Sequence, residues 1–223
     1  AIPALATRNP TRPDLRYILI ASRRSQTRLR LMHIRTRFLC LLALPLGGCL
    51  QSPEADFWNS LTLLCGQAFE GEIVSDDAAD DAWRAERVVM HMRDCSASEI
   101  RIPLAVGDDL SRTWVLTRDK ATMGLHHLHL HEDGSEDALT GYGGIATEDG
   151  SGTRQTFPAD ETTKALFDRE GIPVSNANVW AIEVDPSESL FTYELARPGR
   201  FFRVEFDTSN PVPPPPQHWG AAD

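Results

Sequence analysis

Short apolar segments that alternate with polar positions dominate the chain from Phe69 onward. Phe191, Tyr193 and Leu195 alternate with polar residues, so their side chains fall on one face of an extended strand. A strand with one buried and one solvated face is typical of antiparallel sheets. The pattern predicts nine strands: Phe69–Val74, Arg87–Arg93, Ile100–Val106, Thr113–Arg118, Met123–His131, Ala138–Tyr142, Asn178–Val184, Leu190–Ala196 and Phe201–Phe206.

Two segments carry a helical pattern instead. Phe57, Leu61 and Leu64 recur at the spacing of one helix face, and Gly66 is a stop signal. Asp160–Glu170 has an aspartate in the N-cap position and is followed by a glycine. The pattern therefore predicts a mainly β fold: a single antiparallel barrel or sandwich domain of about nine strands, with one or two short helices.

The N-terminal part of the chain has the pattern of a bacterial lipoprotein signal. Arg35 and Arg37 precede the apolar run Phe38–Leu46, which leads into Leu46-Gly47-Gly48-Cys49. This run is too short for a membrane span, which needs about 20 apolar residues. Small residues before a cysteine are typical of lipidation at that cysteine, here Cys49, and an ordinary secretory signal is the alternative. Leu50 follows in place of aspartate, which favours an outer-membrane anchor facing the periplasm.

This signal sets the expected domain organisation. Residues 1–31 are arginine-rich and precede Met32, so we expect an upstream extension that is not part of the working protein. Residues 32–48 are the signal peptide, 49–56 a lipidated tether and 57–210 the β-rich domain. Residues 211–223 form a proline-rich tail, and Asp76–Asp81 is expected to be a solvated acidic loop.

Charge and cysteine content narrow the possible partners and the compartment. The whole chain has a net charge of −10, and its basic residues are concentrated before Cys49, so the predicted domain is more acidic still. An acidic domain argues against nucleic acid as a partner. Cys65 and Cys95 remain after the signal, and in an oxidising periplasm such a pair is expected to form a disulfide.

The segment Leu125–Gly134 contains the main candidate for chemistry. On a strand His127, His129 and His131 share one face, with successive side chains about 6.5–7 Å apart. A His-x-His pair at that spacing can bind zinc or copper, with Glu132 or Asp133 as a further ligand.

A polar strand face is the other interpretation of this segment. The histidines would then be half-buried and hydrogen-bonded, and Glu132–Ser135 would be a hairpin turn. Arg112, Trp114 and Trp180 are candidates for the mouth of a pocket, with ordinary packing as the alternative.

Several short motifs give the chain a family resemblance. From Phe57 to Gly220 it resembles an uncharacterised family of bacterial secreted proteins and lipoproteins. The resemblance implies that the histidine strand and its turn belong to the family pattern, and it implies no particular activity. The motifs are Cys65–Gly71, Arg101–Pro103, Arg112–Val115, His127–Gly134, Tyr142–Gly144, Phe157–Asp160, Phe202–Asp207 and Trp219-Gly220.

These observations favour a lipid-anchored, periplasm-facing module that binds a small ligand or an envelope protein, rather than an enzyme. A barrel of this size can hold one small ligand. A metal-dependent hydrolase that uses His127 and His129 with zinc or copper is one alternative. A structural lipoprotein that acts through protein contacts is another.

The lipoprotein signal predicts the effect of one substitution. Cys49→Ala removes the thiol that would carry the lipid, so the protein should move from the membrane fraction to the soluble fraction. Fractionation of cells that express either form measures this. Continued membrane association of the variant would contradict the lipid anchor.

Overall fold

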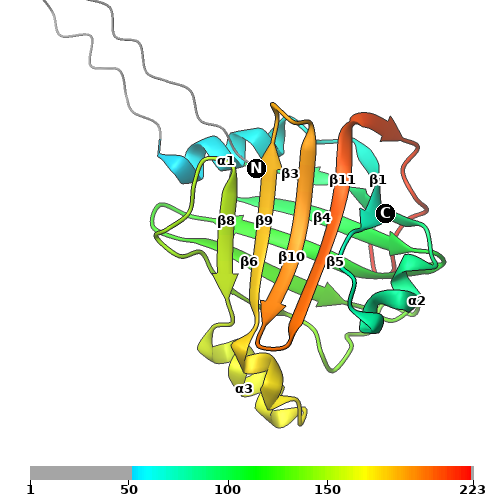
Figure 1. The fold of residues 1–223 in the computed structure, drawn as a ribbon, viewed down its shortest axis with the longest axis vertical. Coiled ribbons are helices and arrows are strands. Elements are labelled where there is room, and N and C mark those ends of the chain that lie inside the picture. Colours follow the sequence, from blue (N-terminus) through cyan, green and yellow to red (C-terminus); the bar gives the residue numbers. More distant parts are fainter. Residues whose placement is uncertain (1–51, 222–223) are drawn as a thin grey trace, which may run out of the picture. The chain divides into compact units, whose positions relative to one another are not determined.

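The computed structural model describes residues 52–221 (Figure 1). These residues form an 11-stranded antiparallel sheet and a few short helices. The strands are β1 (Ala68–Ile73), β2 (Val88–His91), β3 (Asp94–Cys95), β4 (Glu99–Val106), β5 (Asp109–Arg118), β6 (Met123–His129), β7 (Tyr142–Ile145), β8 (Arg154–Pro158), β9 (Val179–Asp185), β10 (Leu190–Arg197) and β11 (Arg200–Val212). The helices are α1 (Pro53–Thr62), α2 (Asp81–Arg84), α3 (Glu161–Arg169) and the 3-10 turns η1 (Ala78–Asp80) and η2 (Pro173–Ala177).

The sheet curls into a nearly closed barrel. Its strand order is β7-β6-β5-β4-β2-β1-β11-β10-β9-β8, with β3 paired only to β4. The two end strands meet through a bridge between Gly144 and Ala159, and just beyond it the Thr147 N–H donates to the Thr156 carbonyl at 3.0 Å. The predicted mainly β, antiparallel fold is confirmed, with more strands and helices than expected.

Two glycines allow the barrel to close. A Cβ on Gly143 would lie 1.8 Å from the Leu125 carbonyl oxygen, and one on Gly144 would lie 1.9 Å from the Pro158 carbonyl oxygen. Any larger residue would push β7 away from its neighbours. The sequence predicts a strand over Ala138–Tyr142. The observed strand β7 begins at Tyr142 instead and runs through these two glycines.

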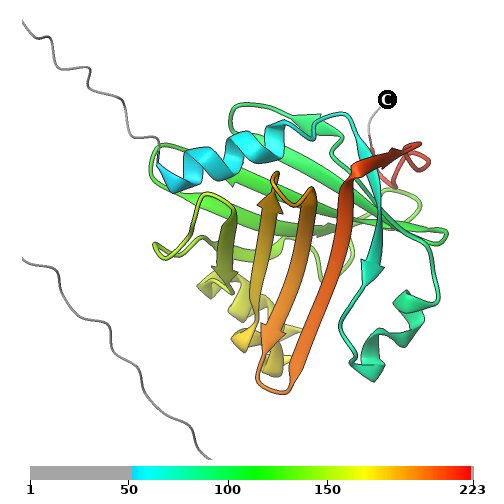
Figure 2. The same ribbon diagram turned by 45° about the horizontal axis from the view of Figure 1, so that its top comes forward.

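Helix α1 covers one end of the barrel, whereas α2 and α3 lie at the other (Figures 1 and 2). The Ser52 side chain accepts a hydrogen bond from the Ala55 N–H at 3.3 Å and caps the first turn. Phe57, Trp58 and Leu61 are almost fully buried in the main core. Burial of this face, rather than helix propensity, holds a helix of ten residues in place.

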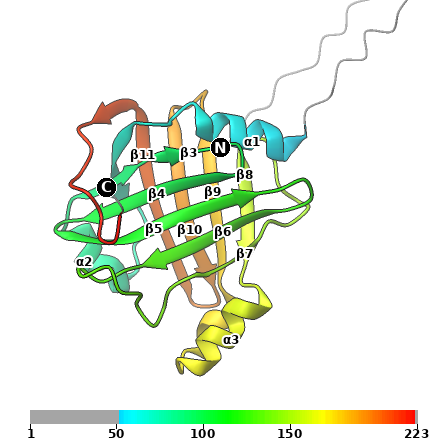
Figure 3. The ribbon, with the colours of Figure 1, turned by 180° about the vertical axis from the view of Figure 1, so that it is seen from behind.

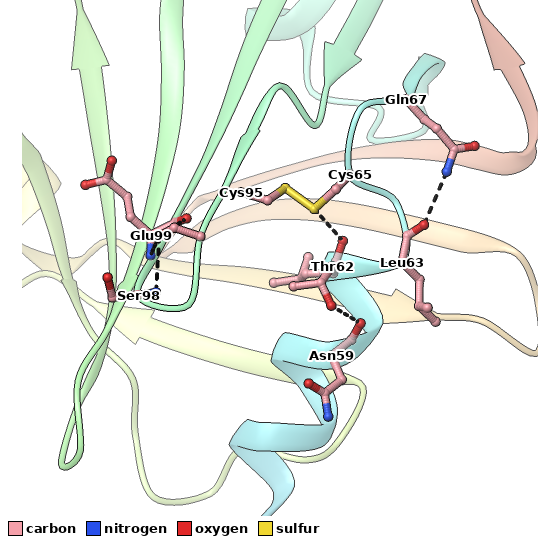
Figure 4. Close-up of a disulfide and its surroundings, with 10 residues drawn as sticks. Asn59, Thr62, Leu63, Cys65, Gln67, Cys95, Ser98 and Glu99 are labelled. Atoms are coloured by element: carbon pink, nitrogen blue, oxygen red, sulfur yellow. Dashed lines mark hydrogen bonds between the residues drawn. A yellow bond between two sulfur atoms is a disulfide. The ribbon is translucent and has the colours of Figure 1, made fainter.

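The predicted disulfide is confirmed. Cys65, in the turn after α1, is bonded to Cys95 on β3 (Figure 4). The bond attaches the turn after α1 to β3, which pairs with β4. The helix is therefore held to the barrel both by its packed face and at its C-terminal end.

Three further segments differ from the prediction. The segment Asp76–Asp81 is not simply a solvated loop, because η1 forms within it and Asp80 is only 3% exposed. Strand β8 was not predicted. Strand β11 continues two residues into the predicted tail, where Val212 pairs with Ala68 of β1.

The last described residues cross the outer face of the sheet (Figure 3). The Trp219 N–H donates to the Leu110 carbonyl at 3.2 Å, and His218 contacts the Arg93 guanidinium. No helix among residues 52–221 is long and apolar enough to cross a membrane.

Reduction of the disulfide should lower stability without changing the fold. The bond joins residues that are 30 positions apart, and closing a loop of that length stabilises by about 3–4 kcal/mol through the unfolded chain. Cys65→Ala/Cys95→Ala should therefore unfold at lower denaturant with an unchanged far-UV spectrum. Two titratable thiols in unreduced protein of residues 50–223, where Cys65 and Cys95 are the only cysteines, would contradict the bond.

Candidate functional site

A cavity of about 370 Å³ opens at the end of the barrel opposite α1. Strands β5, β6, β9, β10 and β11 form most of its wall, and η1, α2, α3 and η2 surround its mouth. Half of its 18 lining residues carry an aromatic or imidazole ring. The lining residues are Ala79, Asp80, Trp83, Arg112, Trp114, His127, His129, Leu139, Tyr142, Phe167, Ile172, Ser175, Asn178, Trp180, Tyr193, Leu195, Arg200 and Phe202.

Every second residue of a strand points into the barrel. On each wall strand, three such residues extend from the core to the mouth of the cavity. On β5, Leu116 is fully buried in the core, and Trp114 and Arg112 follow it in steps of two residues toward the mouth. Strand β6 is the direct neighbour of β5 and pairs with it in register. Its inward residues follow the same order. Leu125 lies in the core beside Leu116, His127 lies beside Trp114, and His129 lies beside Arg112 at the mouth.

The other three strands repeat the order. Inward residues progress from the packed core, through an aromatic position, to a residue at the mouth. These series are Ile182, Trp180 and Asn178 before and within β9, Phe191, Tyr193 and Leu195 on β10, and Val204, Phe202 and Arg200 on β11.

The middle positions form one set of contacting rings, which we call the aromatic layer: Trp114, His127, Trp180, Tyr193 and Phe202. Trp114 and Tyr193 are stacked with centroids 4.2 Å apart and planes 12° apart. His127 lies 5.0 Å from Trp180, and Tyr193 lies 6.2 Å from Phe202. The rings of the layer therefore pack on one another, and together they line the inner part of the cavity.

His127 is the polar centre of the aromatic layer. Its Nδ1 lies 3.1 Å from the Tyr142 carbonyl oxygen and its Nε2 lies 2.8 Å from the Tyr193 hydroxyl. A carbonyl only accepts, so Nδ1 carries the proton and donates. In the neutral ring Nε2 is then the acceptor, and the Tyr193 hydroxyl donates to it.

Burial keeps this pair uncharged. Desolvation lowers the pKa of His127 to about 3, against the opposing effect of its bond to the Tyr142 backbone. Burial also raises the pKa of the Tyr193 phenol well above its usual value. Both groups are neutral across the physiological range, and the phenol oxygen can still accept a hydrogen bond.

A second histidine–tyrosine pair lies next to the first. The Tyr142 hydroxyl is 3.3 Å from His129 Nε2, and the Tyr142 ring stacks on His127 with centroids 4.6 Å apart. Burial raises the pKa of Tyr142 to about 12. Burial, and then the charge of Arg112, lower the pKa of His129 to about 4.

Charged side chains appear only at the mouth of the cavity. Arg200 donates to both carboxylate oxygens of Asp80, whose Oδ2 also accepts from the Ser75 hydroxyl at 3.0 Å. Arg112 donates to Asp109, and its guanidinium lies 4.9 Å from the centre of the Trp83 ring. These contacts fix η1 and α2 beside the opening.

The structure separates the five residues that the sequence suggested as metal ligands. His127 and His129 share the cavity face, as alternation requires. His131 is exposed, with its Nε2 3.7 Å from Asp137, and Asp133 accepts from Ser135 within the turn. Glu132 lies in the same exposed turn.

Among residues 52–221, no three His, Cys, Asp or Glu side chains are grouped so that they could hold a metal ion. Cys49, the predicted lipidation site, lies outside the described residues.

The sequence identified some of the residues that line the cavity and missed others. Arg112, Trp114 and Trp180 were candidates and do line the cavity. Tyr193 and Phe202 carried a signal only as apolar members of alternating strands, and nothing distinguished them from core residues. The acidic run Asp76–Asp81 predicts a solvated loop that includes Asp80. The sequence does not reveal its partner Arg200, which is 120 positions away.

Comparisons of the chain with models of known protein families, with curated proteins and with solved structures found no match.

The low pKa of His127 predicts how acid affects stability. The unfolded chain takes up a proton at His127 near pH 6.5, whereas the folded protein keeps the ring neutral down to about pH 3. The contribution of His127 is therefore complete above pH 6.5. It is lost as the pH falls below that value, by at most about 1.4 kcal/mol per pH unit.

His127→Gln tests this contribution, because the amide can pair with both partners but does not titrate. Denaturant unfolding at pH 7.5, 6, 5 and 4.5 should show a steeper loss of stability in the natural protein than in the variant. Parallel curves would show that His127 is protonated in the folded state.

Proposed function

We propose that this protein binds a small organic molecule in the cavity at the open end of its barrel. The observation that carries the proposal is a cavity of about 370 Å³ with aromatic walls and two neutral histidine–tyrosine pairs. Small-molecule sites have volumes of about 300–1,000 Å³ and combine apolar walls with a few placed polar groups.

The protonation states favour binding over acid–base catalysis. A general acid or base works best when its pKa lies near the operating pH. Burial moves the pKa of His127 to about 3, of His129 to about 4 and of Tyr142 to about 12, so all three move away from neutrality. These groups are suited to hold hydrogen bonds rather than to transfer protons.

The hydrogen bonds of His127 favour an organic ligand over a metal ion. A metal ligand needs a free ring nitrogen, and both nitrogens of His127 already contact protein groups. His129 is the only other histidine in the cavity wall, and its Nε2 faces the Tyr142 hydroxyl.

We also propose that the protein is held in the bacterial envelope through a lipid on Cys49, facing the periplasm. The signal-like sequence before Cys49 and the disulfide in the domain support this location. Cys49 precedes α1, which begins at Pro53 within the predicted tether, and the cavity opens at the other end of the barrel. The mouth would thus face away from the membrane, toward ligands or partners in the periplasm.

Filling the cavity tests the proposal. Leu195 lines the cavity near its mouth, so Leu195→Trp places an indole in the space that a ligand needs. Val179 is 36% exposed on β9 and is not a lining residue, so Val179→Trp is the matched control. The neutral fluorophore N-phenyl-1-naphthylamine should bind the natural protein and the control at least about tenfold more tightly than Leu195→Trp.

Equal binding by all three proteins would place the fluorophore elsewhere on the surface. Absence of binding to the natural protein, together with no change in its melting temperature across a library of small aromatic compounds, would reject a small-molecule site.

A further inference from the structure

We propose that the cavity takes an uncharged organic molecule with a carbonyl group, and that the side-chain amide of Asn178 at the mouth donates a hydrogen bond to that carbonyl. This ligand class rests on the proposed function and makes it more specific. Two separate observations carry it. The charged side chains of the cavity wall are paired within the protein, and the Asn178 amide has N–H groups that no protein group uses.

Pairing within the protein leaves the cavity wall without a free charge. Among the described residues, three charged side chains line the cavity: Asp80, Arg112 and Arg200. Arg200 donates to Asp80 and, at 3.3 Å, to Asp77, and Arg112 donates to Asp109. The two histidines of the wall are kept neutral by burial. A charged ligand would lose its hydration without gaining a free counter-charge, so the wall favours an uncharged one.

The Asn178 side chain has a fixed orientation. The residue directly follows η2, is only 6% exposed and lines the cavity. Arg197 Nη1 lies 2.9 Å from Asn178 Oδ1. Because arginine only donates, this contact identifies the oxygen end of the amide. Nδ2 is therefore the other end, and among residues 52–221 no acceptor lies within hydrogen-bond distance of it.

These free N–H groups face open space rather than packed protein. Four polar side-chain atoms in the described part of the chain are fully enclosed and unpaired, and Asn178 Nδ2 is not one of them. Since Asn178 is almost buried and lines the cavity, the open space beside Nδ2 is the cavity itself. A ligand that supplies an acceptor there gains a hydrogen bond, whereas an apolar group would leave the donors unpaired.

Two neighbours make this position a good site for a carbonyl oxygen. Arg197 does not line the cavity, but its positive charge at Oδ1 polarises the amide and strengthens the N–H donors. Ser175 lies on the same turn, because its carbonyl accepts from the Asn178 backbone N–H at 3.0 Å. It also lines the cavity and is 8% exposed, so its hydroxyl is a second donor. A carbonyl oxygen has two lone pairs and can accept from both.

Four probes separate charge from hydrogen bonding: 2-acetylnaphthalene, its hydrocarbon isostere 2-isopropenylnaphthalene, 2-naphthoate and 2-naphthylmethylammonium. Equilibrium dialysis against the full chain at pH 7.5 measures the binding of each probe. The ketone should bind at least about tenfold more tightly than either charged probe. The hydrocarbon is the reference for binding without the hydrogen bond.

Substitution of Asn178 should act on the ketone alone. Asn178→Asp replaces the N–H groups with an oxygen of similar size and keeps the contact with Arg197. It should weaken binding of the ketone at least about fivefold and leave the hydrocarbon nearly unchanged. Ser175→Ala should weaken the ketone in the same selective way, to a smaller extent and without a change of charge.

Asn59→Asp is the matched control. It makes the same change of charge on an exposed residue of α1, at the other end of the barrel from the cavity mouth. All four probes should bind this variant as they bind the natural protein. Melting temperatures of the three variants show that each is folded under the conditions of the dialysis.

The outcomes distinguish the ligand class from the ligand site. Binding of either charged probe as tight as that of the ketone would overturn the assignment of an uncharged ligand. Equal losses of ketone and hydrocarbon in Asn178→Asp and Ser175→Ala, no loss in either, or the same loss in Asn59→Asp would overturn the hydrogen bond to a carbonyl. The cavity would remain a ligand site in each of these cases. Failure of every probe to bind, together with failure of the neutral fluorophore, would reject the site itself.

Discussion

The hydrogen bonds of His127 organise the interior of this barrel. One ring joins β6 to the backbone of β7 and to the side chain of Tyr193 on β10, across the space between the strands. A buried imidazole without both partners would cost about 1–3 kcal/mol per unsatisfied group. Both partners are present, so neither ring nitrogen is left unsatisfied, and burial keeps the ring neutral. The Tyr142 ring stacks on it, and the Trp180 ring packs against it with the planes 43° apart.

Around His127, alternation along the strands places residues of different polarity at different depths of the barrel. Each step of two residues leads from an aliphatic or aromatic core, through the aromatic layer, to polar residues at the mouth. At the opposite end α1 packs on the core, and the disulfide fixes the loop that follows it. The two ends of the barrel therefore differ, and ligand access follows from this asymmetry.

The sequence allowed the fold to be predicted where the information was local. The alternation over Leu190–Ala196 gave β10 almost to the residue, and the aspartate before Glu161 gave the start of α3. The disulfide followed from compartment and cysteine count alone. Strand β8 was missed because glycine and serine residues precede it, and they resemble a continuous loop.

The site could not be predicted in the same way, because its contacts join distant parts of the chain. The bond between His127 and Tyr193 spans 66 positions, and that between Asp80 and Arg200 spans 120. The His-x-His-x-His pattern pointed to β6, two of whose histidines line the cavity, and the metal interpretation of that pattern stays a prediction. Only the partners of His127 on β7 and β10 favour a hydrogen-bonding role, and no local spacing could show them.

The protonation state of His127 tests this account most directly. Nitrogen NMR spectra of the protein with ¹⁵N-labelled histidine report which ring nitrogen carries the proton, with His127→Gln to assign the signal. The account predicts a neutral ring protonated on Nδ1 that does not titrate between pH 5 and 8 and is unchanged by one equivalent of zinc. A charged ring within that range, or an Nε2 signal that shifts when zinc is added, would contradict a hydrogen-bonding role and favour catalysis or metal binding.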